Sequence, residues 1–588
     1  MRGIAVNMVA EPEGNPDEFS ISIAGVDLAS GTRVEFPKSG VTAIVGPNNS
    51  GKSTLLRQIT AHVAQGPSAR VRDKTFLVDG VQLQMSGTAA DAVAWLKKHV
   101  VVTEDNGIAI YHGVRAGGIQ EGNVLVRFRE GINAGLQELN SLLVFYGDAW
   151  NRLNGASAVE QRDVFSSPPT APMHVLQDDF MLFEELNQIC EKVFGKSLTL
   201  DRLSKQVNLR VGRTGVPAPS VERVTEEYLA ALSALPHLME QGDGMKSMLG
   251  MLTPLLTSTY PVIFIDEPEA FLHPPQAAAV GKILGEQAKL RGAQIILATH
   301  DRNLLTGLLE SDAEVSIVRL DRSASDVTRS HQLNARDLRD VWADPVLRYS
   351  NVLDGLFHRL VVLAEGDRDC HFYAAALEDA AASVGLPFSS GDVLFVPSGG
   401  KGGIPRLAKI LRSVNVPVVA SPDLDVLNNR EMIKSIVESF GGDWSDLESD
   451  YNSATAAFRQ PPDKVTVAQV LAALNGIFGE RGSELFTSET RKEFAAQMRT
   501  KESMWSDLKD YGVLAFKGQA AQAAQRLLDK LDSIGVVAVR VGELEKFAPT
   551  LGVAKGPAWL PAAIGAGSHR DRDVRGHVMT LIAKANLD

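Results

Sequence analysis

A glycine-rich segment near the N-terminus most constrains what this chain can fold into. Its nine residues read Gly46-Pro-Asn-Asn-Ser-Gly-Lys-Ser-Thr54, after an apolar run at 41–45 and before a helical pattern that begins near Lys52. At a strand-to-helix turn of this kind, backbone N–H groups surround phosphate oxygens and the lysine reaches the β/γ-phosphates. We therefore expect an α/β fold with an ATP site contacted by Gly46, Asn49, Gly51, Lys52, Ser53 and Thr54, with Ser53 also ligating Mg²⁺.

A second motif fits the same chemistry. The apolar run 262–265 ends in Asp266, which would hold the Mg²⁺ shell, and Glu267, which would orient or deprotonate the attacking water. From 222 to 345 helix and strand patterns alternate, which is typical of a parallel sheet covered by helices. These motifs together predict an ATPase with Glu267 as its catalytic residue.

Two further acidic groups follow apolar runs in the C-terminal half. Glu365 and Asp369 come after one run, and Asp423 and Asp425 come after another. Carboxylates at the ends of buried strands converge on hard divalent cations such as Mg²⁺ and Mn²⁺. Taken alone, an Asp-x-Asp favours a strand-end turn, since about one or two arise by chance in a chain this acidic and 571–573 is another. The order and spacing of the four acids favour a metal site for phosphodiester chemistry.

Composition bounds the rest of the interpretation. The 588 residues allow two to four domains at roughly 150 residues each. No apolar run reaches the ~20 residues of a membrane span, the N-terminus lacks a signal-peptide core, and two cysteines form no zinc spacing. We therefore expect a cytoplasmic chain with no membrane partner.

A net charge of −12 argues against a broadly basic nucleic-acid surface. A DNA path needs only a local basic stripe, and two clusters are candidates for one. They are Lys401, Arg406, Lys409 and Arg412, and Arg570, Arg572 and Arg575. Either cluster is equally consistent with an ordinary solvated surface.

The pattern divides the chain at a connector near 346–358. We expect an ATPase domain at 1–345, in which 65–135 carries no recognisable chemistry and is a candidate insertion. We expect a second α/β domain at 346–588, in which the charged, helix-forming segment 430–510 is a helical insertion.

Taken in order, the N-terminal motifs resemble the ABC-type ATPases. In that family a histidine after the next strand contacts the γ-phosphate, and the loop after the catalytic glutamate lies at a dimer interface. By this resemblance His300 takes the first role and the loop around His273 the second. The segment 241–247 stands where the family carries its signature loop, but it does not match the LSGGQ form of transporters. That departure disfavours a transporter subunit and leaves the nucleotide-gripping residue open.

The acidic groups resemble the Toprim domain. The resemblance rests on a strand ending in Glu-Gly, a strand–helix unit carrying the glycine-rich 398–402, and a strand ending in Asp-x-Asp. It implies that divalent metals bind Glu365, Asp369, Asp423 and Asp425, with Glu365, Asp423 and Asp425 as the catalytic set.

Two further parts of the Toprim pattern stay open. Strand character at 536–540 precedes a Gly-x-x-Glu element, so Glu545 is either an additional metal ligand or a surface acid. The family also uses a lysine that stabilises charge in the transition state. Lys555 and Lys517 are the candidates here, and neither stands in a firm motif.

An ABC-type ATPase followed by a Toprim domain resembles the OLD (overcoming lysogenisation defect) family of ATP-dependent endonucleases. The resemblance implies an α/β protein with an N-terminal P-loop ATPase head and a C-terminal Rossmann-like Toprim domain carrying a helical insertion. It implies ATP-regulated, Mg²⁺- or Mn²⁺-dependent cleavage or nicking of DNA and assembly into homodimers or higher oligomers through the heads. It also implies defence against phage or mobile elements, in some members with a helicase or reverse-transcriptase partner. The alternatives are an RNA- or tRNA-cleaving nuclease, and an ATP-dependent sensor or scaffold whose Toprim half binds a partner or nucleic acid without cleaving.

Overall fold

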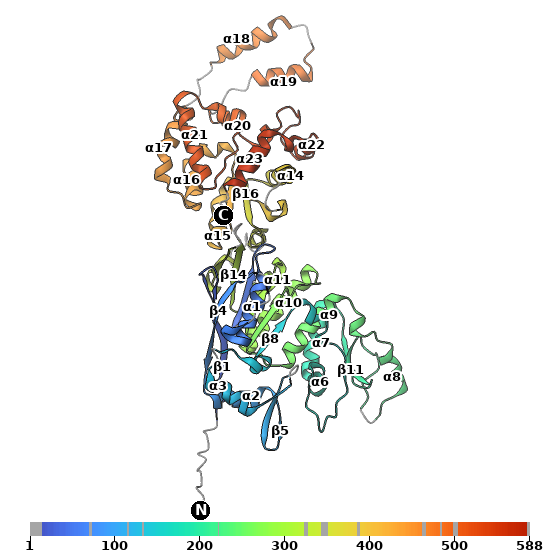
Figure 1. Cartoon of the computed structure of the whole chain (residues 1–588). Coiled ribbons are helices and arrows are strands. Elements are labelled where there is room, and N and C mark those ends of the chain that lie inside the picture. The colour runs from blue at the N-terminus through green and yellow to red at the C-terminus, as the bar shows by residue number, and fades with distance from the viewer. Residues whose placement is uncertain are drawn as a thin grey trace, which may run out of the picture. The chain divides into compact units, whose positions relative to one another are not determined.

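Parallel β-sheets with helices around them build both units of the chain, Met1–Phe357 and His358–Asp588 (Figure 1). This arrangement confirms the α/β fold class expected from the sequence. The computed structural model describes residues 14–69, 73, 75–113, 117–131, 134–220, 223–322, 327–342, 351–384, 389–460, 466–481, 485–497 and 504–584. The domain boundary expected at 345/346 lies outside the described residues.

A six-stranded sheet forms the centre of the N-terminal unit. In order across the sheet its strands are β15 (Thr328–Leu333), β14 (Val315–Arg322), β3 (Gly40–Val45), β13 (Gln294–Ala298), β12 (Val262–Asp266) and β8 (Val144–Gly147). Neighbouring strands run parallel except β15, which is antiparallel to β14. The carboxyl ends of β3 and β12 therefore meet at one edge of the sheet, where ligands bind in folds of this kind.

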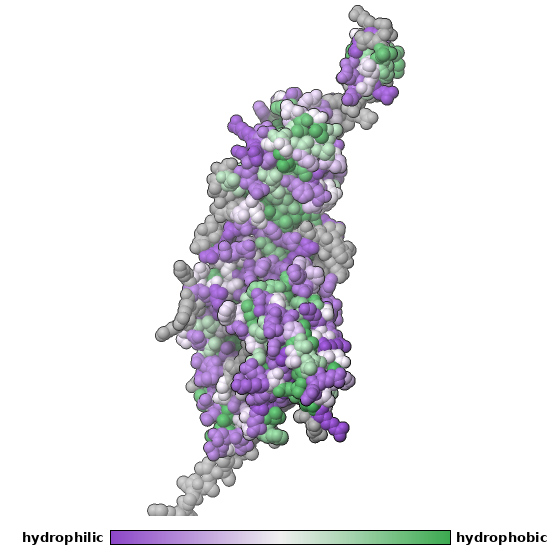
Figure 2. Space-filling model, turned by 90° about the vertical axis from the view of Figure 1, so that its right-hand side faces the viewer, coloured by the Kyte–Doolittle hydropathy of each residue, from purple (hydrophilic) through white to green (hydrophobic). Residues whose placement is uncertain are grey.

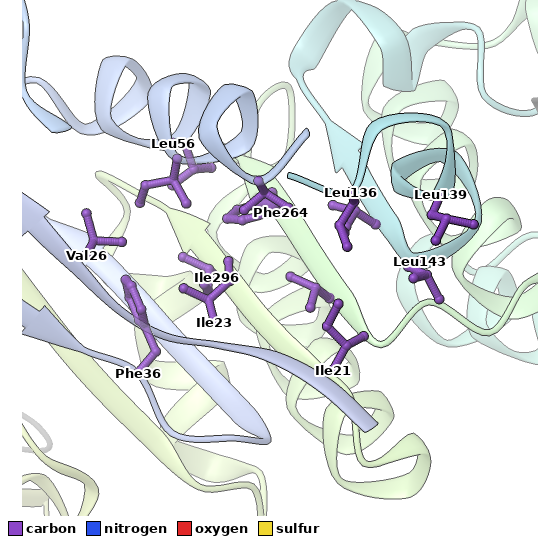
Figure 3. Packing of buried hydrophobic residues seen from close by; sticks show 14 of the residues in the cluster. Ile21, Ile23, Val26, Phe36, Leu56, Leu136, Leu139, Leu143, Phe264 and Ile296 are labelled. Carbon is purple, nitrogen blue, oxygen red and sulfur yellow. The ribbon is translucent and has the colours of Figure 1, made fainter. Parts of the chain in front are cut away.

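The helix that follows the glycine-rich loop, α1 (Lys52–Gln65), packs between this sheet and a second one. Leu56 of α1 lies in one buried cluster with Phe264 and Ile296 of the central sheet and Ile23 of the second sheet (Figure 3). That second sheet is antiparallel, in the order β2 (Arg33–Glu35), β1 (Ser20–Leu28), β4 (Val78–Ser86). Gln294 joins the two sheets, since its Nε2 donates to Ile23 O and its Oε1 accepts from Ile23 N, both at 2.9 Å.

The other described elements of this unit surround the two sheets. The candidate insertion at 65–135 supplies β4 to the antiparallel sheet and then forms α2 (Ala89–His99), β5 (Val101–Asp105), β6 (Ile108–His112), β7 (Gly118–Gln120) and α3 (Glu121–Glu130). Further along come α5 (Ala149–Leu153), α8 (Glu226–Ser233), α9 (Asp243–Thr257), α10 (Pro274–Arg291) and α11 (Arg302–Glu310). The last two pack against each other and α10 contacts β3.

Two elements differ from what their sequence patterns predict. The apolar run 142–145 is typical of a strand, but β8 begins only at Val144, because the preceding residues form a short helix, α4 (Asn140–Leu143). The periodicity of 176–194 predicts one helix, but the chain forms two, α6 (Pro172–Asp178) and α7 (Phe180–Phe194). Asp179 separates them because its backbone is extended and its side chain caps α7.

The C-terminal unit is built on three parallel strands in the order β17 (Val393–Pro397), β16 (Leu360–Ala364), β18 (Val418–Ser421). Between them come α14 (Asp367–Val384) after β16 and α15 (Ile404–Ser413) after β17. The chain thus leaves β16 to one side and returns on the other, which creates a topological switch point at the carboxyl end of β16. The strand character at 536–540 extends the sheet by two parallel bridges, Ala420 to Val536 and Asp423 to Val539.

Helices make up most of the remaining C-terminal unit. The segment expected to be a helical insertion is helical in its described residues, which form α16 (Arg430–Ser439), α17 (Trp444–Thr455), α18 (Val467–Phe478), α19 (Ser488–Gln497) and α20 (Ser506–Tyr511). Later elements are η12 (Gly512–Ala515), α21 (Gly518–Ser533), η13 (Leu544–Phe547), α22 (Trp559–Gly565) and α23 (Arg572–Ala583). Among the described residues, no helix has the length and apolar character to cross a membrane. Figure 2 shows hydrophobic residues in separate groups between hydrophilic ones on the face turned to the viewer.

Candidate functional site

The glycine-rich loop closes around its own lysine. Lys52 is 8% exposed, and its Nζ donates to the carbonyl oxygens of Gly46 at 2.9 Å and Pro47 at 3.0 Å. Gly51 has a φ of 97°, which favours glycine, and a Cβ on Gly46 would lie 2.3 Å from Leu320 O. Burial lowers the pKa of Lys52, and the carboxylates nearby oppose that shift. Gly46 thus lets the loop pack closely against β14, and the buried cation that the loop surrounds fits a phosphate group.

Ser53 links this loop to the second motif. Its Oγ donates to Asp266 Oδ1 at 2.9 Å, and burial raises the pKa of Asp266. The two side chains offer adjacent oxygen ligands for a hard cation beside the phosphate site. Of the remaining loop residues, Asn49 is exposed with a φ of 63°, and Thr54 Oγ1 accepts from Arg57 Nη2 at 3.2 Å.

Glu267 and His300 come together with a third residue, Glu269. His300 Nδ1 lies 3.4 Å from Glu267 Oε1 and 3.3 Å from Glu269 Oε1. Glu269 is buried, which raises its pKa, and its Oε1 also accepts from Thr299 Oγ1 at 2.8 Å and from His300 N at 3.0 Å. The side chains of Glu267 and His300 remain 42% and 48% exposed. Glu269 therefore positions the histidine from the protein interior, a role that no sequence motif marks.

A buried arginine holds the backbone of both acidic residues of the second motif. Arg152 on α5 is fully buried, and it donates to Asp266 O at 2.5 Å and to Glu267 O at 2.7 Å. Its Nε donates to Ser247 Oγ on α9 at 3.3 Å. Glu267 has a φ of 49°, an uncommon conformation for a residue with a side chain, and Arg152 holds its carbonyl there. Nothing local in the sequence marks Arg152, which precedes Asp266 by 114 residues.

The segment 241–247, expected in the position of the signature loop, forms the start of α9. Ser247 is 1% exposed and is engaged by Arg152, so it is not available to grip a nucleotide. A Cβ on Gly244 would lie 2.5 Å from Phe271 O, which places this segment beside the loop that leads to His273. Phe271 is 54% exposed. The two segments assigned to a dimer interface by resemblance thus share one surface.

Three carboxylates meet at the carboxyl ends of β16 and β18. The strands pair in parallel with Ala364 opposite Ser421, so Glu365 and the Asp423–Asp425 loop leave the sheet side by side. Asp423 N donates to Glu365 Oε1 at 3.1 Å. One carboxylate oxygen from each of Glu365, Asp423 and Asp425 lies within 4.8 Å of the other two. The sheet thus brings together three of the four acids selected from the sequence.

The environment of these acids suits a cation. Burial raises the pKa of Glu365, and burial followed by the charge of Glu365 raises the pKa of Asp423 to about 8. Asp423 Oδ1 is buried and has no hydrogen-bond partner among the described residues. A buried, unpaired carboxylate oxygen is costly unless a cation or a donor meets it. The all-oxygen, convergent donor set with one unsatisfied oxygen fits a hard divalent ion.

Two lysines hold Asp425 in place. Lys401 Nζ lies 2.8 Å from Asp425 Oδ1, and Lys509 Nζ lies 3.1 Å from Asp425 Oδ2. Burial alone would raise the pKa of Asp425, but the two ammonium groups keep it below its ordinary value. Lys401, a candidate for a basic stripe in the sequence, therefore contacts the acidic group instead. Lys509 arrives from α20, and no sequence pattern indicates it.

Two family models match the chain, an ATPase model in the N-terminal unit and a Toprim model that follows it. The AAA domain associated with the AbiEii toxin of type IV toxin–antitoxin systems matches residues 203–306, which include Asp266, Glu267 and His300. The Toprim domain of proteins similar to the overcoming lysogenisation defect protein matches residues 356–425. The chain has the ATPase–Toprim architecture of the OLD family. This confirms the resemblance inferred from the motifs, and the two domains imply the use of a nucleotide and a divalent metal.

Individual relatives match shorter stretches. The phosphate import ATP-binding protein PstB of Pyrobaculum aerophilum is 36% identical over 63 residues, 11% of this chain and 25% of that protein. An uncharacterised protein of Methanocaldococcus jannaschii is 35% identical over 78 residues, 13% of this chain and 67% of that protein. This chain thus spans a quarter of the length of the first relative and about two thirds of the second.

Solved structures similar to the chain include ATPase heads. The SMC head domain from Thermotoga maritima is 14% identical, with 54% of this chain and 99% of that chain covered and a TM-score of 0.28. The protein cbiO1 from Clostridium perfringens, part of an ABC transporter complex, is 15% identical, with 56% of this chain and 95% of that chain covered and a TM-score of 0.27.

In the Toprim unit, the other two candidate ligands lie outside the group of three acids. Asp369 Oδ2 accepts from Gly366 N at 3.0 Å, and burial, with a smaller contribution from the charge of Glu545, raises its pKa. Glu545 Oε1 accepts from Arg368 at 3.1 Å, and its Oε2 lies 3.4 Å from Lys555 Nζ. The Glu545 side chain is 11% exposed and is paired with these two cations, so it is partly buried.

The basic residues selected from the sequence differ in their ion-pair partners. Lys555 pairs with Glu543 at 2.9 Å as well as with Glu545, whereas Lys517 precedes α21 and has no ion-pair partner among the described residues. In the second basic cluster, Arg570 and Arg575 both pair with Asp379, the former at 3.4 Å. These two arginines are therefore partly neutralised within the unit.

Proposed function

We propose that this chain is an ATP-regulated, divalent-metal-dependent nuclease that cleaves or nicks DNA. The observation that carries the proposal is the approach of Glu365, Asp423 and Asp425 within 4.8 Å, with Asp423 Oδ1 buried and unsatisfied among the described residues. When bound, divalent ions supply charge neutralisation and activation of water for phosphodiester hydrolysis.

The acids of the Toprim unit would bind the metal ions, and the lysines beside them would contact the phosphate. Glu365, Asp423 and Asp425 would hold one ion, and Asp369 with Glu545 would supply the carboxylates beside it for a second. The lysines lie around these acids, where their ammonium groups would stabilise negative charge on the phosphate. Lys555 is favoured over Lys517 for this role because it pairs with Glu545, and Lys401 and Lys509 flank Asp425 from the other side.

In the ATPase unit, Lys52 would bind the β/γ-phosphates, and Ser53 with Asp266 would hold the Mg²⁺ of the nucleotide. Glu267 would orient the attacking water. His300, held against Glu267 and Glu269, would contact the γ-phosphate.

Two heads would enclose the nucleotide between them. The side chains of Glu267 and His300 are half exposed. The start of α9 lies beside the loop of Phe271, which is also exposed. A second head could therefore cover the nucleotide at this surface. We expect Glu267→Gln to keep ATP binding, abolish turnover and shift the protein to a dimer with ATP, measured by light scattering after size exclusion. A monomer under those conditions would contradict this arrangement.

Plasmid cleavage tests the nuclease assignment. Supercoiled plasmid with Mn²⁺ and ATP should be nicked or linearised by the wild type and left intact by Asp423→Ala. The matched control is Asp571→Ala, because Asp571 is an exposed acid of an Asp-x-Asp that lies outside the predicted metal site. Cleavage of single-stranded RNA or tRNA but not DNA would select the RNA alternative. Absence of cleavage with any metal or nucleotide would select the sensor or scaffold alternative.

The role in defence rests on the family resemblance. Cells that express the wild type should plate phage less efficiently than cells that express Asp423→Ala. Equal plating across a phage panel would count against this role.

A further inference from the structure

Helix α15 of the Toprim unit has one apolar face and one cationic face. Its apolar face packs on β16 and β18, and the residues that form it are buried. They are Ile404, Leu407, Ala408 and Leu411. Three cations, each three residues from the next, are exposed on the other side of the helix. They are Arg406, Lys409 and Arg412.

No acid in the same stretch of chain balances these charges. Between Asp392 and Asp423 the sequence contains four cations and neither aspartate nor glutamate, although the net charge of the chain is −12. The first turn of α15 holds Arg406 and no acid, whereas the helix dipole favours acids there. Cations three residues apart also repel each other on a helix surface. The charges therefore do not stabilise the helix, which favours a role in binding an anion.

The acids of the neighbouring helix have partners of their own. α16 packs against α15, and its charged residues are two cations and two acids. Glu431 pairs with Arg430 at 2.7 Å, and Glu438 lies 3.9 Å from Lys434. The charges of α16 therefore cancel within that helix and leave the cationic face of α15 uncompensated.

Two of the cations on this face are available to a ligand. Among the described residues, the side chains of Lys409 and Arg412 have neither an ion-pair nor a hydrogen-bond partner. The Arg412 guanidinium lies beside the turn at Gly441, where a Cβ would be 3.0 Å from Nη2. Asp443, the acid that follows this turn, caps α17 instead by accepting from Ser445 N at 2.9 Å.

The cationic stretch begins at the acidic centre. Lys401 precedes α15 by three residues, and its Nζ lies 2.8 Å from Asp425 Oδ1. Because α15 connects parallel strands, it starts at their carboxyl ends, where the acids lie, and runs back along the sheet. At 1.5 Å per residue, Lys409 and Arg412 lie roughly 8 and 12 Å along the helix from Ile404. At 3.4 Å per nucleotide of one strand, these distances correspond to roughly two to four nucleotides.

We propose that the exposed face of α15 binds backbone phosphates of duplex DNA on one side of the phosphate at the acidic centre. Lys409 and Arg412 each contact one phosphate. They are positioning residues, which hold the DNA strand in place and take no part in breaking the bond. The position of the cleaved phosphate rests on the proposed function, whereas DNA binding by α15 is measured without cleavage.

The test is fluorescence anisotropy of a short labelled DNA duplex with the full-length protein, in EDTA and over a series of KCl concentrations. Each phosphate contact contributes about 0.9 to the slope of log K against log salt concentration. Lys409→Gln combined with Arg412→Gln should therefore lower the slope by about two. The same relation predicts binding weaker by on the order of 10- to 100-fold at ~0.1 M salt, with the difference vanishing toward 1 M.

Two further double variants separate contact from net charge and from folding. Arg491→Gln with Lys492→Gln makes the same change of charge at exposed residues of α19 and should keep the wild-type slope. Lys409→Arg with Arg412→Lys retains both charges and should also keep it. An equal loss of slope in the α19 variant, or a loss in the charge-retaining variant, would overturn the proposal.

Cleavage distinguishes this proposal from the nuclease assignment. With Mn²⁺ and ATP, the glutamine variant of Lys409 and Arg412 should raise the KM for plasmid and leave kcat near the wild-type value. A reduced slope together with an inactive wild type would refute only the nuclease assignment. A wild-type slope in the glutamine variant, or no saturable duplex binding by the wild type, would overturn the role of α15. Binding of single-stranded RNA but not of duplex DNA through these residues would overturn the assignment to DNA.

Discussion

Arg152 offers the sharpest test of how the ATPase unit positions Glu267, the proposed catalytic residue. Its guanidinium is fully buried and donates to the carbonyl oxygens of Asp266 and Glu267, and also to Ser247 on α9. Arg152→Met keeps a side chain of similar length but removes all these donors. Arg152→Lys keeps the charge on a single ammonium group, which lacks the fork that reaches two carbonyls at once.

The expected loss of stability is modest. Glu267 O keeps a hydrogen bond from Ala270 N at 2.9 Å, so the main cost falls on Asp266 O. A buried acceptor left without its donor costs about 1–3 kcal/mol. Removal of a desolvated charge offsets part of this, because burial already lowers the pKa of Arg152. The free energy of unfolding should fall by about 1–3 kcal/mol, which leaves the unit folded.

The expected loss of activity is larger. Glu267 stands at a φ of 49° that Arg152 helps to maintain, and a displacement of about 1 Å in a catalytic group costs on the order of 100-fold in rate. Arg152→Met should therefore lower kcat for ATP hydrolysis by on the order of 100-fold, with Arg152→Lys in between. The Kd for a fluorescent ATP analogue should stay near the wild-type value, because Lys52 and its loop are untouched.

Phosphate release, analogue binding and thermal unfolding should be measured on the same preparations. Ser247→Ala is the matched control, since it removes one hydrogen bond of 3.3 Å and should cost only about 0.5–1.5 kcal/mol. Wild-type turnover in folded Arg152→Met would refute the positioning role. A parallel loss of binding, turnover and thermal stability would show that Arg152 serves the fold alone.

Three other outcomes follow from the two sites. Lys52→Ala should abolish ATP hydrolysis measured by phosphate release, because no other cation replaces a buried ammonium group in the loop; unchanged turnover would contradict the loop assignment. The pKa of Asp423 is raised to about 8, so its carboxyl stays protonated at lower pH and must lose that proton before it binds a cation. The apparent affinity for Mn²⁺, measured by calorimetry, should therefore rise about tenfold per pH unit toward pH ~8 and level off above it, and Asp423→Asn should flatten this dependence. Lys509→Met should tighten Mn²⁺ binding, since a cation that competes for Asp425 is lost, yet slow plasmid cleavage on the order of 100-fold; faster cleavage would assign Lys509 an inhibitory role.

Much of the candidate chemistry could be predicted from local patterns. A glycine-rich turn between strand and helix, and acids at the ends of apolar runs, are signals carried by consecutive residues. Parallel pairing then determines that Glu365 and Asp423 leave the sheet together, because the carboxyl ends of neighbouring parallel strands share an edge. The predicted order of the two domains is confirmed for the same reason, since each motif is contiguous.

Other local patterns do not show how their residues are packed. Ser247 lies in the segment expected to carry a signature loop, yet it is buried against Arg152. The helix expected across 176–194 breaks at Asp179, because a capping carboxylate outweighs a continuous apolar periodicity. Lys401 belongs to a cluster of basic residues in the sequence, but its ammonium group is engaged by Asp425.

The sequence by itself determined which residue types stand at strand ends, and therefore the ATPase–Toprim order and the acids of the proposed metal site. Only the tertiary structure decided which partners control those residues: Arg152 behind Glu267, and Lys509 against Asp425. The physical reason is the separation in sequence over which each effect acts. Strand, turn and helix patterns depend on neighbours in sequence, whereas the partner of a buried charge is selected by packing among elements far apart in the chain, such as α5 against β12 and α20 against the loop after β18.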